Sequence, residues 1–282
     1  MKLFVFGLGY SATHLVLARR DMFSSVAGTQ RTAHRRDELA RAGVDALPFD
    51  GGAARAAAEA DAIVVSIPPG DDGADPVLAA FGETLAAARA RAVLYLSTVG
   101  VYGDAGGAWV DEATPPRPTS PRNVARVAVE ARWRDLFGER LHSLRLSGIY
   151  GPGRSAIRAL RTGAARRTSK PGQVFNRIHV DDIAGFAGHL LAAPRPGADW
   201  NVTDDEPAPQ ADVVAFAAGL AGVEPPPERP FDEAELSPMA REFWAENKRV
   251  GNARMRAVGY APRHPTYREG LRAIFAETGG AG

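Results

Sequence analysis

The sequence contains no cysteine among its 282 residues, and Lys2, Lys170 and Lys248 are its only lysines. The missing cysteine excludes disulfide bonds, thiolate ligands for zinc and a cysteine nucleophile. The other 31 of the 34 basic residues are arginines. A reaction scheme that needs a lysine between positions 3 and 169 is therefore excluded.

The sequence also lacks an excess of either charge and any long apolar run. Its 34 basic and 33 acidic residues give a net charge of +1, which argues against a nucleic-acid partner because such proteins usually carry a strong basic excess. No apolar run approaches the roughly 18 residues of a membrane span, and the N-terminus enters an apolar segment without a basic leader. We therefore expect a cytoplasmic protein that binds neither nucleic acid nor a membrane.

Short apolar runs alternate with helical patterns through the first half of the chain. Runs typical of buried parallel strands lie at residues 1–6, 25–29, 45–49, 62–67, 92–97 and 141–146. Helical patterns lie between them at 15–20, 34–42, 76–90 and 122–137. This alternation predicts an α/β fold with a Rossmann-type, doubly wound parallel sheet over residues 1–150.

The second half of the chain has a different character. We expect residues 151–282 to form mainly a small C-terminal substrate lobe, with segments near 174–203 returning to the core sheet. The proline cluster at 225–230 is typical of a surface linker.

A glycine-rich loop joins the first predicted strand to the first helix. Gly7, Gly9 and Ala12 have the spacing at which small residues let the backbone approach a pyrophosphate at a helix N-terminus. The alternative is a turn without a ligand. We expect a dinucleotide whose pyrophosphate lies against Gly7, Leu8, Gly9, Tyr10, Ser11 and Ala12.

The end of the second strand distinguishes two nicotinamide cofactors. Folds that select NAD place a carboxylate there, whereas this sequence has Thr29 and Arg31. A guanidinium pairs bidentately with a phosphate, so we expect NADP, with NAD as the less favoured cofactor. The alternative is that Arg31 is simply solvated.

Further cofactor contacts are expected after the third and fourth strands. Asp50 could accept a hydrogen bond from the adenine amino group, or be a plain loop carboxylate. Ser66, Ile67 and Pro68 stand where this type of fold passes the adenosine ribose, although a proline also simply ends a strand.

Several motifs occur together in one order along the chain. They are LSTVGVYG at 96–103, WVDE at 109–112, PTSP at 118–121, GIYGPG at 148–153, IHVDD at 178–182 and VGYAP at 258–262. In this order they resemble the extended short-chain dehydrogenase/reductase superfamily, of the NAD-dependent epimerase/dehydratase type. The resemblance covers nearly the whole chain and is strongest to the atypical, YeeZ-like branch.

The resemblance implies several roles. Thr98 would polarise the substrate, and Ser147 and Gly148 would contact the nicotinamide carboxamide. Relatives often form a homodimer through a four-helix bundle, which here would use residues 76–90 and 122–137.

The usual acid/base pair of this superfamily is missing. In relatives a tyrosine exchanges a proton with the substrate, and a lysine four residues later holds the nicotinamide ribose. Arg122 and Arg126 occupy these two positions here. Arg126 can still hold the ribose hydroxyls, whereas Arg122, with a pKa above about 12, neither gives nor takes a proton at neutral pH.

The two arginines leave three hypotheses open. In the first, an NADP-dependent oxidoreductase or epimerase uses another acid/base, with Tyr102 first, Tyr150 second and His179 third. In the second, Arg122 binds an anionic group of a small substrate, and the chemistry needs only hydride delivery and polarisation by Thr98. In the third, the protein is a non-catalytic NADP(H)-binding sensor or regulatory protein.

The substrate side of the site is less determined. The segments that form the substrate cleft in relatives carry candidate substrate contacts, namely Tyr150, Arg154, Arg177, His179 and Arg249. Phe175 stands where relatives that bind nucleotide sugars carry an arginine, which disfavours such a substrate.

Two further expectations concern histidines and carboxylates. The histidines are scattered without the spacing of metal ligands, so we expect no metal site. Asp181 and Asp182 are expected to fix a loop and to cap the helix that follows.

Overall fold

The computed structural model describes residues 1–193, 195–232 and 238–278. The chain divides into two compact units, and each is described by itself. Unit 1 consists of Met1–Val101, Pro121–Arg145 and Ile183–Trp200. Unit 2 consists of Tyr102–Ser120, Leu146–Asp182 and Asn201–Gly282.

Unit 1 is built on a parallel sheet of seven strands in the order β11-β7-β5-β4-β1-β2-β3. The strands are β1 (Lys2–Phe6), β2 (Ser25–Thr29), β3 (Asp45–Leu47), β4 (Ala62–Val65), β5 (Ala92–Thr98), β7 (Leu141–Leu146) and β11 (Asp199–Val202). This confirms the predicted Rossmann-type α/β fold. The strand order reverses between β1 and β4, and ligands of such folds bind at this switch point.

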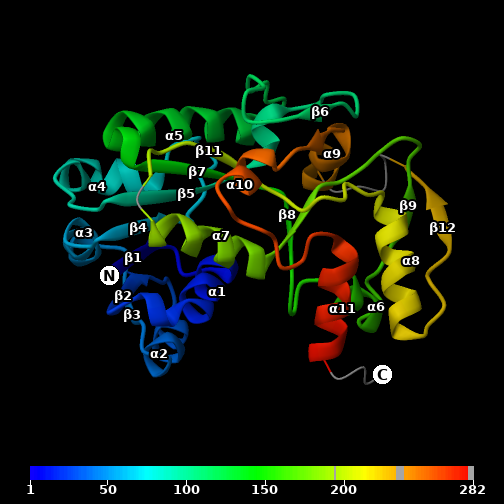
Figure 1. Ribbon diagram of the computed structural model, residues 1–282, viewed down its shortest axis with the longest axis horizontal. Helices are drawn as coiled ribbons and strands as arrows, with labels where there is room; N and C mark the ends of the chain where they lie inside the picture. Colours follow the sequence, from blue (N-terminus) through cyan, green and yellow to red (C-terminus); the bar gives the residue numbers. More distant parts are fainter. Residues whose placement is uncertain (194, 233–237, 279–282) are drawn as a thin grey trace. The chain divides into compact units, whose positions relative to one another are not determined.

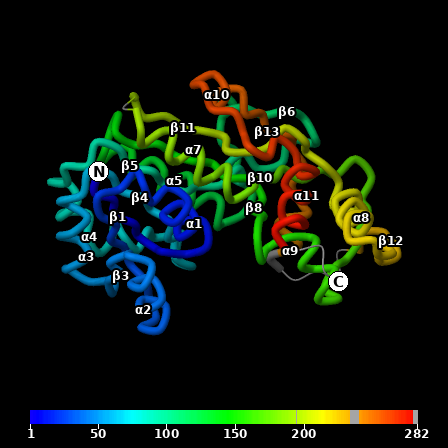
Figure 2. Tube along the Cα trace, turned by 60° about the horizontal axis from the view of Figure 1, so that its bottom comes forward, coloured from blue at the N-terminus to red at the C-terminus, as the bar shows by residue number. Residues whose placement is uncertain are grey.

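Helices cover both faces of this sheet (Figure 1). They are α1 (Tyr10–Ala18), α2 (Ala33–Arg41), α3 (Gly51–Ala58), α4 (Pro76–Ala86), α5 (Pro121–Phe137) and α7 (Val180–Ala192). Side chains of α3, α4 and α5 share one core with β1, β4 and β5, centred on Phe6, Phe81 and Trp133. On the other face α7 lies beside the end of α1, where Gly188 contacts Arg19 and Met22 (Figure 2).

Helix α3 is absent from the sequence-based prediction. It begins with Gly51 and Gly52, which are poor helix formers. Two contacts compensate. The Oδ1 atom of Asp50 caps the helix by accepting hydrogen bonds from the backbone N–H groups of Gly52 at 2.8 Å and Ala53 at 3.3 Å, and an alanine face packs into the core.

Unit 2 contains three small parallel pairs of strands and five helices in the part that the structure describes. The pairs are β8 (Gly148–Tyr150) with β10 (Arg177–His179), β9 (Arg167–Ser169) with β12 (Glu228–Pro230), and β6 (Trp109–Val110) with β13 (Arg249–Val250). The helices are α6 (Ala156–Arg161), α8 (Gln210–Ala221), α9 (Pro238–Ala245), α10 (Ala253–Ala257) and α11 (Tyr267–Glu277). The prediction of a linker over residues 225–230 is wrong for its last three residues, because they form β12 and pair with β9.

The core of unit 2 lies between α6, α8 and α11, where Ile157, Ala217 and Leu271 pack together. Within the described residues, no helix of either unit is both long enough and apolar enough to cross a bilayer.

Candidate functional site

The loop after β1 is held in place by the end of β2. The backbone N–H of Gly7 donates to Thr29 Oγ1 at 2.8 Å, and the N–H of Leu8 donates to the Thr29 carbonyl at 2.9 Å. Gly7 has a φ of +89°, and a Cβ atom there would lie 2.7 Å from Ile67 Cγ1. Only glycine therefore fits between the ends of β1 and β4. Thr29 shapes this loop, and its contact with a phosphate stays a prediction.

Helix α1 presents an open N-terminus beyond this loop. Its N-cap is Gly9, which has no side chain to bond the first turn, and a Cβ atom at Gly9 would meet nothing within 4 Å. The first N–H groups of a helix have no partner within it, and its dipole attracts an anion. The predicted pyrophosphate site at residues 7–12 thus has the donors and the space that such a group needs.

The backbone of Arg31 is held in place just after the end of β2. Its backbone N–H donates to Gln30 Oε1 at 2.7 Å, and its carbonyl accepts from Arg36 Nη1 at 3.0 Å. Arg35, by contrast, pairs with Glu38 at 2.6 Å. The exposed guanidinium of Arg31 makes no hydrogen bond or ion pair within the described residues. Arg31 therefore has a fixed backbone and a charge that no carboxylate neutralises.

The other predicted adenosine contacts lie after β3 and β4. Asp50 uses one carboxylate oxygen for the cap of α3. Ser66 continues the pairing of β4 with β1, since its N–H donates to the Phe6 carbonyl at 2.8 Å. Ile67 packs against Gly7, and Pro68 follows it. Ser66 and Ile67 therefore lie beside the loop after β1, on its β4 side.

Arg126 is fixed against β5. Its Nη1 donates to the Tyr95 hydroxyl at 3.0 Å and to the Leu96 carbonyl at 3.1 Å. The side chain is buried, and its Nε has no hydrogen-bond partner. A buried, unpaired donor is costly unless a ligand satisfies it. The guanidinium therefore fits the ribose-binding role that the resemblance implies for this position.

Thr98 ends β5 next to the start of α5. Its Oγ1 accepts a hydrogen bond from the Gly100 N–H at 3.1 Å, which leaves the hydroxyl proton to donate elsewhere. A Cβ atom at Gly100 would lie 2.6 Å from the side-chain amide of Asn123, so glycine allows α5 to approach this loop. Arg122, one residue earlier in α5, is exposed and makes no ion pair within the described residues.

The three candidate acid/base residues lie in unit 2 and are hydrogen-bonded there. The Tyr102 hydroxyl is buried and donates to Asn201 Oδ1 at 2.7 Å. The Tyr150 hydroxyl donates to the Thr266 carbonyl at 3.4 Å, and burial raises the pKa of this phenol above its usual range. His179 accepts the Asp181 N–H through Nδ1 at 3.2 Å. These contacts favour structural roles for all three.

The predicted nicotinamide contacts also belong to unit 2. The Ser147 N–H donates to the Val202 carbonyl at 3.2 Å, and the Gly148 N–H donates to the Asn176 carbonyl at 3.0 Å. The Ser147 hydroxyl is buried without a partner. A ligand amide is one group that could satisfy it.

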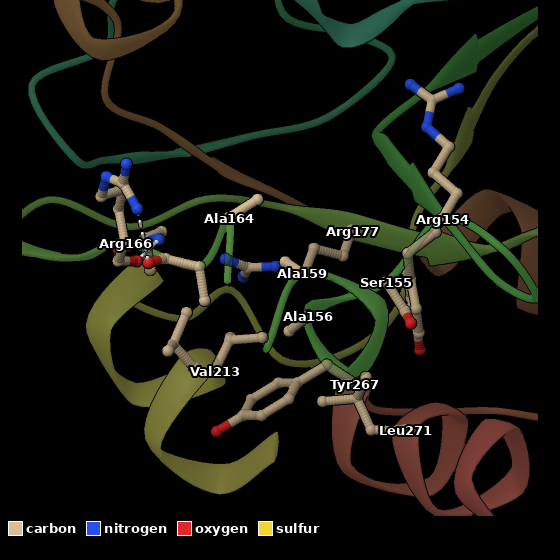
Figure 3. A pocket seen from close by; sticks show the side chains of 14 residues that line it. Arg154, Ser155, Ala156, Ala159, Ala164, Arg166, Arg177, Val213, Tyr267 and Leu271 are labelled. Atoms are coloured by element: carbon tan, nitrogen blue, oxygen red, sulfur yellow. Dashed lines mark hydrogen bonds between the residues drawn. The ribbon is translucent and has the colours of Figure 1, made fainter. Parts of the chain in front are cut away.

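Unit 2 contains a pocket of about 410 Å³ between α6, α8, α11 and β10. Its lining includes Arg154, Arg166 and Arg177 but no aspartate or glutamate. Figure 3 shows Arg177 pointing into the space beside Ala159 and Ala164, whereas Arg154 points away from it. The pocket is therefore positive, with walls of small apolar side chains.

Arg177 is the most constrained charge of this pocket. Its Nη1 donates to the carbonyls of Phe175 at 2.9 Å and Ala208 at 3.0 Å, and its Cζ lies 5.9 Å from the centre of the Tyr267 ring. Burial lowers the pKa of Arg177, and the nearby Asp204 partly offsets this effect. These carbonyl contacts leave further guanidinium N–H groups for an anion in the pocket.

Sequence reasoning missed Tyr267, Asp204 and Gln210. Tyr267 forms a wall of the pocket. Asp204 is buried near Arg177, and burial raises the pKa of its carboxyl well above the usual value. Gln210 bonds the Thr168 N–H at 2.8 Å and so fixes the pocket rim. Asp204 stands in an acidic run that resembles a solvated surface, and nothing local marks the other two.

Arg249 and Asp182 both hold loops of unit 2 in place. Arg249 bonds the Gly107 carbonyl through Nη1, and its N–H donates to the Ala108 carbonyl at 2.9 Å, so it holds the loop before β6. Asp182 lies in the first turn of α7. Its carboxylate accepts from the N–H groups of Arg263 at 2.6 Å and His264 at 3.0 Å, so it fixes a loop as expected, and the cap of α7 stays a prediction.

Comparison with known proteins finds a matching family model and several similar proteins. The model of the NAD dependent epimerase/dehydratase family matches residues 76–203. Protein YeeZ of Escherichia coli (strain K12) is 30% identical over 243 residues, which are 80% of this chain and 85% of YeeZ. A structure of a functionally unknown conserved protein from Silicibacter pomeroyi is 44% identical, with a TM-score of 0.89 and 99% of each chain covered. The 3-diazoavenalumate denitrifying reductase of a Streptomyces species is 31% identical over 175 residues, which are 58% of this chain and 55% of that protein.

Proposed function

Because the chain belongs to the NAD dependent epimerase/dehydratase family, we propose that it is an NADP(H)-dependent oxidoreductase acting on a small organic anion. The observation that carries the proposal is the arrangement around β5. There Arg126 is fixed by Tyr95 and Leu96 with its Nε unpaired, and the Thr98 hydroxyl has a proton to donate. The usual site of the family combines a hydroxyl residue, a tyrosine and a lysine. Thr98 and Arg126 stand for the first and the last, and Arg122 replaces the tyrosine.

The cofactor assignment rests on the loop after β1 and on Arg31. The open N-terminus of α1 suits a pyrophosphate, and the family description supports a nicotinamide dinucleotide. The guanidinium of Arg31 follows β2 where a 2′-phosphate would lie, and no carboxylate follows that strand to hold a free 2′-hydroxyl. NADP(H) is therefore the cofactor that these residues fit best.

The chemistry that a bound nicotinamide supplies is hydride transfer. In the reducing direction, Thr98 donates a hydrogen bond to the substrate oxygen on which negative charge develops. Loss of one such donor typically costs about 100- to 1,000-fold in rate. Arg122 cannot supply the proton because of its high pKa. It pairs instead with an anionic group of the substrate, and water supplies the proton that completes the reduction.

A pocket in unit 2 is a second argument for an anionic substrate. Its lining includes no carboxylate and two arginines besides Arg154, which points away from the space, and small apolar side chains form much of its walls. Such a lining suits a carboxylate or phosphate attached to an apolar body. The name of the Streptomyces relative, a reductase, agrees with reduction as the direction of the reaction.

The test is NADPH oxidation by the purified protein with a panel of aldehydes and ketones that carry a carboxylate. Thr98→Ala should lower the turnover rate at least about 100-fold without changing NADPH affinity, whereas Thr98→Ser, which keeps the hydroxyl, should retain most of it. Tight NADPH binding with no turnover of any compound would instead favour the non-catalytic sensor.

A further inference from the structure

Three potential metal ligands meet in unit 2, and none of them lines the pocket described there. They are His179 at the end of β10, Asp181 in the first turn of α7, and His264 in the loop before α11. His264 Nε2 lies 3.1 Å from Asp181 Oδ2, and His179 Nδ1 lies 3.6 Å from the same oxygen. One nitrogen or oxygen atom from each residue thus faces a common point.

The distances suit a small divalent ion. Bonds of about 2.0–2.1 Å in a tetrahedral site separate neighbouring ligand atoms by about 3.4 Å. The two measured separations, 3.1 and 3.6 Å, lie on either side of this value. All three ligand atoms lie within 4.8 Å of one another, so small side-chain rotations bring them to coordination distance.

The backbone around the cluster is fixed by Asp182. Its carboxylate accepts hydrogen bonds from the N–H groups of Arg263 and His264 and, at 3.0 Å, from the Tyr260 hydroxyl. These bonds hold the loop that carries His264 against the start of α7. Groups that orient metal ligands in this way typically change metal affinity by about 10- to 100-fold.

One existing contact must give way to an ion. The Asp181 N–H donates to His179 Nδ1 at 3.2 Å, and because this nitrogen has a single lone pair, a metal ion bound there replaces that hydrogen bond. Both histidine side chains are buried, at 2% and 4% exposure, which excludes competing water. Two imidazoles and one carboxylate form a donor set that suits zinc.

Two positively charged groups near Asp181 oppose the binding of a cation. The N-terminus of α7 carries the positive end of the helix dipole, and Arg263 Nη1 lies 3.6 Å from Asp181 Oδ2. Arg263 is 75% exposed, however, and can turn to solvent when an ion arrives. The arginine therefore competes with a metal for Asp181 rather than blocking the site.

We propose that His179, Asp181 and His264 form a three-ligand site for Zn²⁺. The bound ion ties the loop before α11 to the end of β10 and so stabilises unit 2. The sequence predicts no metal site because its histidines lack metal spacing, but the fold brings together residues that are 83 positions apart. This inference is independent of the proposed oxidoreductase activity.

The test is titration of the full-length, chelator-treated protein with Zn²⁺ by calorimetry, and with Co²⁺ by visible absorption. We expect one ion per chain, a tetrahedral cobalt spectrum and a rise in the melting temperature with Zn²⁺. His264→Gln and Asp181→Asn should each weaken binding at least about 10-fold. The matched control is His34→Gln, which removes an exposed histidine 3.2 Å from Glu38 and should bind normally.

The variant Arg263→Ala tests the proposal even if the ligand variants fail to fold. It keeps all three ligands and removes the guanidinium that competes for Asp181. This variant should therefore bind Zn²⁺ several times more tightly than the natural protein. The absence of a stoichiometric site in the natural protein would overturn the proposal. Equal affinity in His264→Gln, or weaker binding in Arg263→Ala, would do the same.

Discussion

The Nη1 atom of Arg126 donates a hydrogen bond of 3.0 Å to the hydroxyl of Tyr95, which joins α5 to β5. Burial of this tyrosine raises its pKa above the usual range, so the phenol stays protonated. The same Nη1 donates to the Leu96 carbonyl, two residues before Thr98. The arginine that stands in place of the family's lysine is therefore positioned by the strand that ends at Thr98, the residue proposed to polarise the substrate.

Tyr95→Phe should weaken both stability and cofactor binding. It leaves part of a buried guanidinium unsatisfied, which costs about 1–3 kcal/mol of the free energy of unfolding. It also lets Arg126 turn away from the ribose, so the dissociation constant for NADPH should rise. Urea unfolding and fluorescence titration with NADPH measure the two effects.

Tyr260→Phe is the matched control, because its hydroxyl bonds Asp182 in unit 2 and not Arg126. It should lose stability without a change in NADPH affinity. If both variants bind NADPH like the natural protein, the Tyr95 hydroxyl does not position the cofactor contact.

Arg31→Ala should reduce the preference for NADPH over NADH at least about tenfold, because the bidentate partner of the 2′-phosphate is lost. NADH affinity should change little. Arg35→Ala is the control, since Arg35 is an exposed arginine nearby that already pairs with Glu38. Calorimetric titration of each variant with both cofactors measures the selectivity. Equal selectivity in the natural protein and Arg31→Ala would show that Arg31 is only solvated.

Tyr102→Phe distinguishes a structural phenol from a proton donor. The Tyr102 hydroxyl donates to Asn201 Oδ1 at 2.7 Å inside unit 2. We expect a loss of about 1 kcal/mol in the free energy of unfolding and a turnover rate within about twofold of the natural protein. A large fall in turnover, together with a lost limb of its pH profile, would restore Tyr102 as the acid/base.

Local features of the cofactor side could be predicted from the sequence. The β1 strand, the glycine spacing and α1 are encoded within about a dozen consecutive residues, so the phosphate loop follows from periodicity and glycine position. The exposed charge of Arg31 likewise follows from its place after β2. The loss of the family's tyrosine at Arg122 could also be predicted, because it depends on residue type alone.

Features that depend on distant contacts could not be predicted. The two carbonyls that hold Arg177 belong to Phe175 and Ala208, and only folding brings Ala208 to this position. The hydrogen bond between Tyr102 and Asn201 joins residues 99 positions apart. Such pairs leave no local pattern in the sequence. The sequence therefore indicates Tyr102 as a candidate for catalysis and gives no sign of Tyr267.

His142 should make stability depend on pH below neutrality. Burial, reinforced by the charges of Arg195 and Arg134, lowers the pKa of its imidazole to about 4, and its Nδ1 accepts from Trp200 Nε1 at 3.1 Å. The unfolded chain, with a histidine pKa of about 6.5, binds the proton first as pH falls. The stability is thus complete above pH 6.5 and falls by up to about 3 kcal/mol as pH approaches 4.

His142→Gln should flatten this dependence, because glutamine can accept from Trp200 but does not titrate in this range. Urea unfolding between pH 4 and pH 7 measures the slope. His34→Gln, at an exposed site, should leave the slope unchanged. A natural protein whose stability is constant over this interval would contradict the assignment.

Two glycines in helices should respond in opposite directions to alanine. Glycine in a helix interior normally costs about 0.5–1 kcal/mol relative to alanine. A Cβ atom at Gly219 in α8 would meet nothing within 4 Å, so Gly219→Ala should stabilise by up to that amount. At Gly270 in α11, a Cβ atom would lie 2.0 Å from the Tyr150 hydroxyl and 2.7 Å from its Cζ.

Gly270→Ala must therefore displace Tyr150, which is buried and lines the pocket of unit 2. Overpacking of this kind costs about 1–3 kcal/mol, which exceeds the gain in helix propensity, so this variant should be less stable than the natural protein. Because Tyr150 also lines the pocket, its displacement should change the binding of an anionic substrate. The double variant Gly270→Ala with Tyr150→Phe removes the hydroxyl that clashes first and should recover part of the lost stability. If Gly270→Ala were as stable as Gly219→Ala, the close approach of Tyr150 to α11 would be wrong.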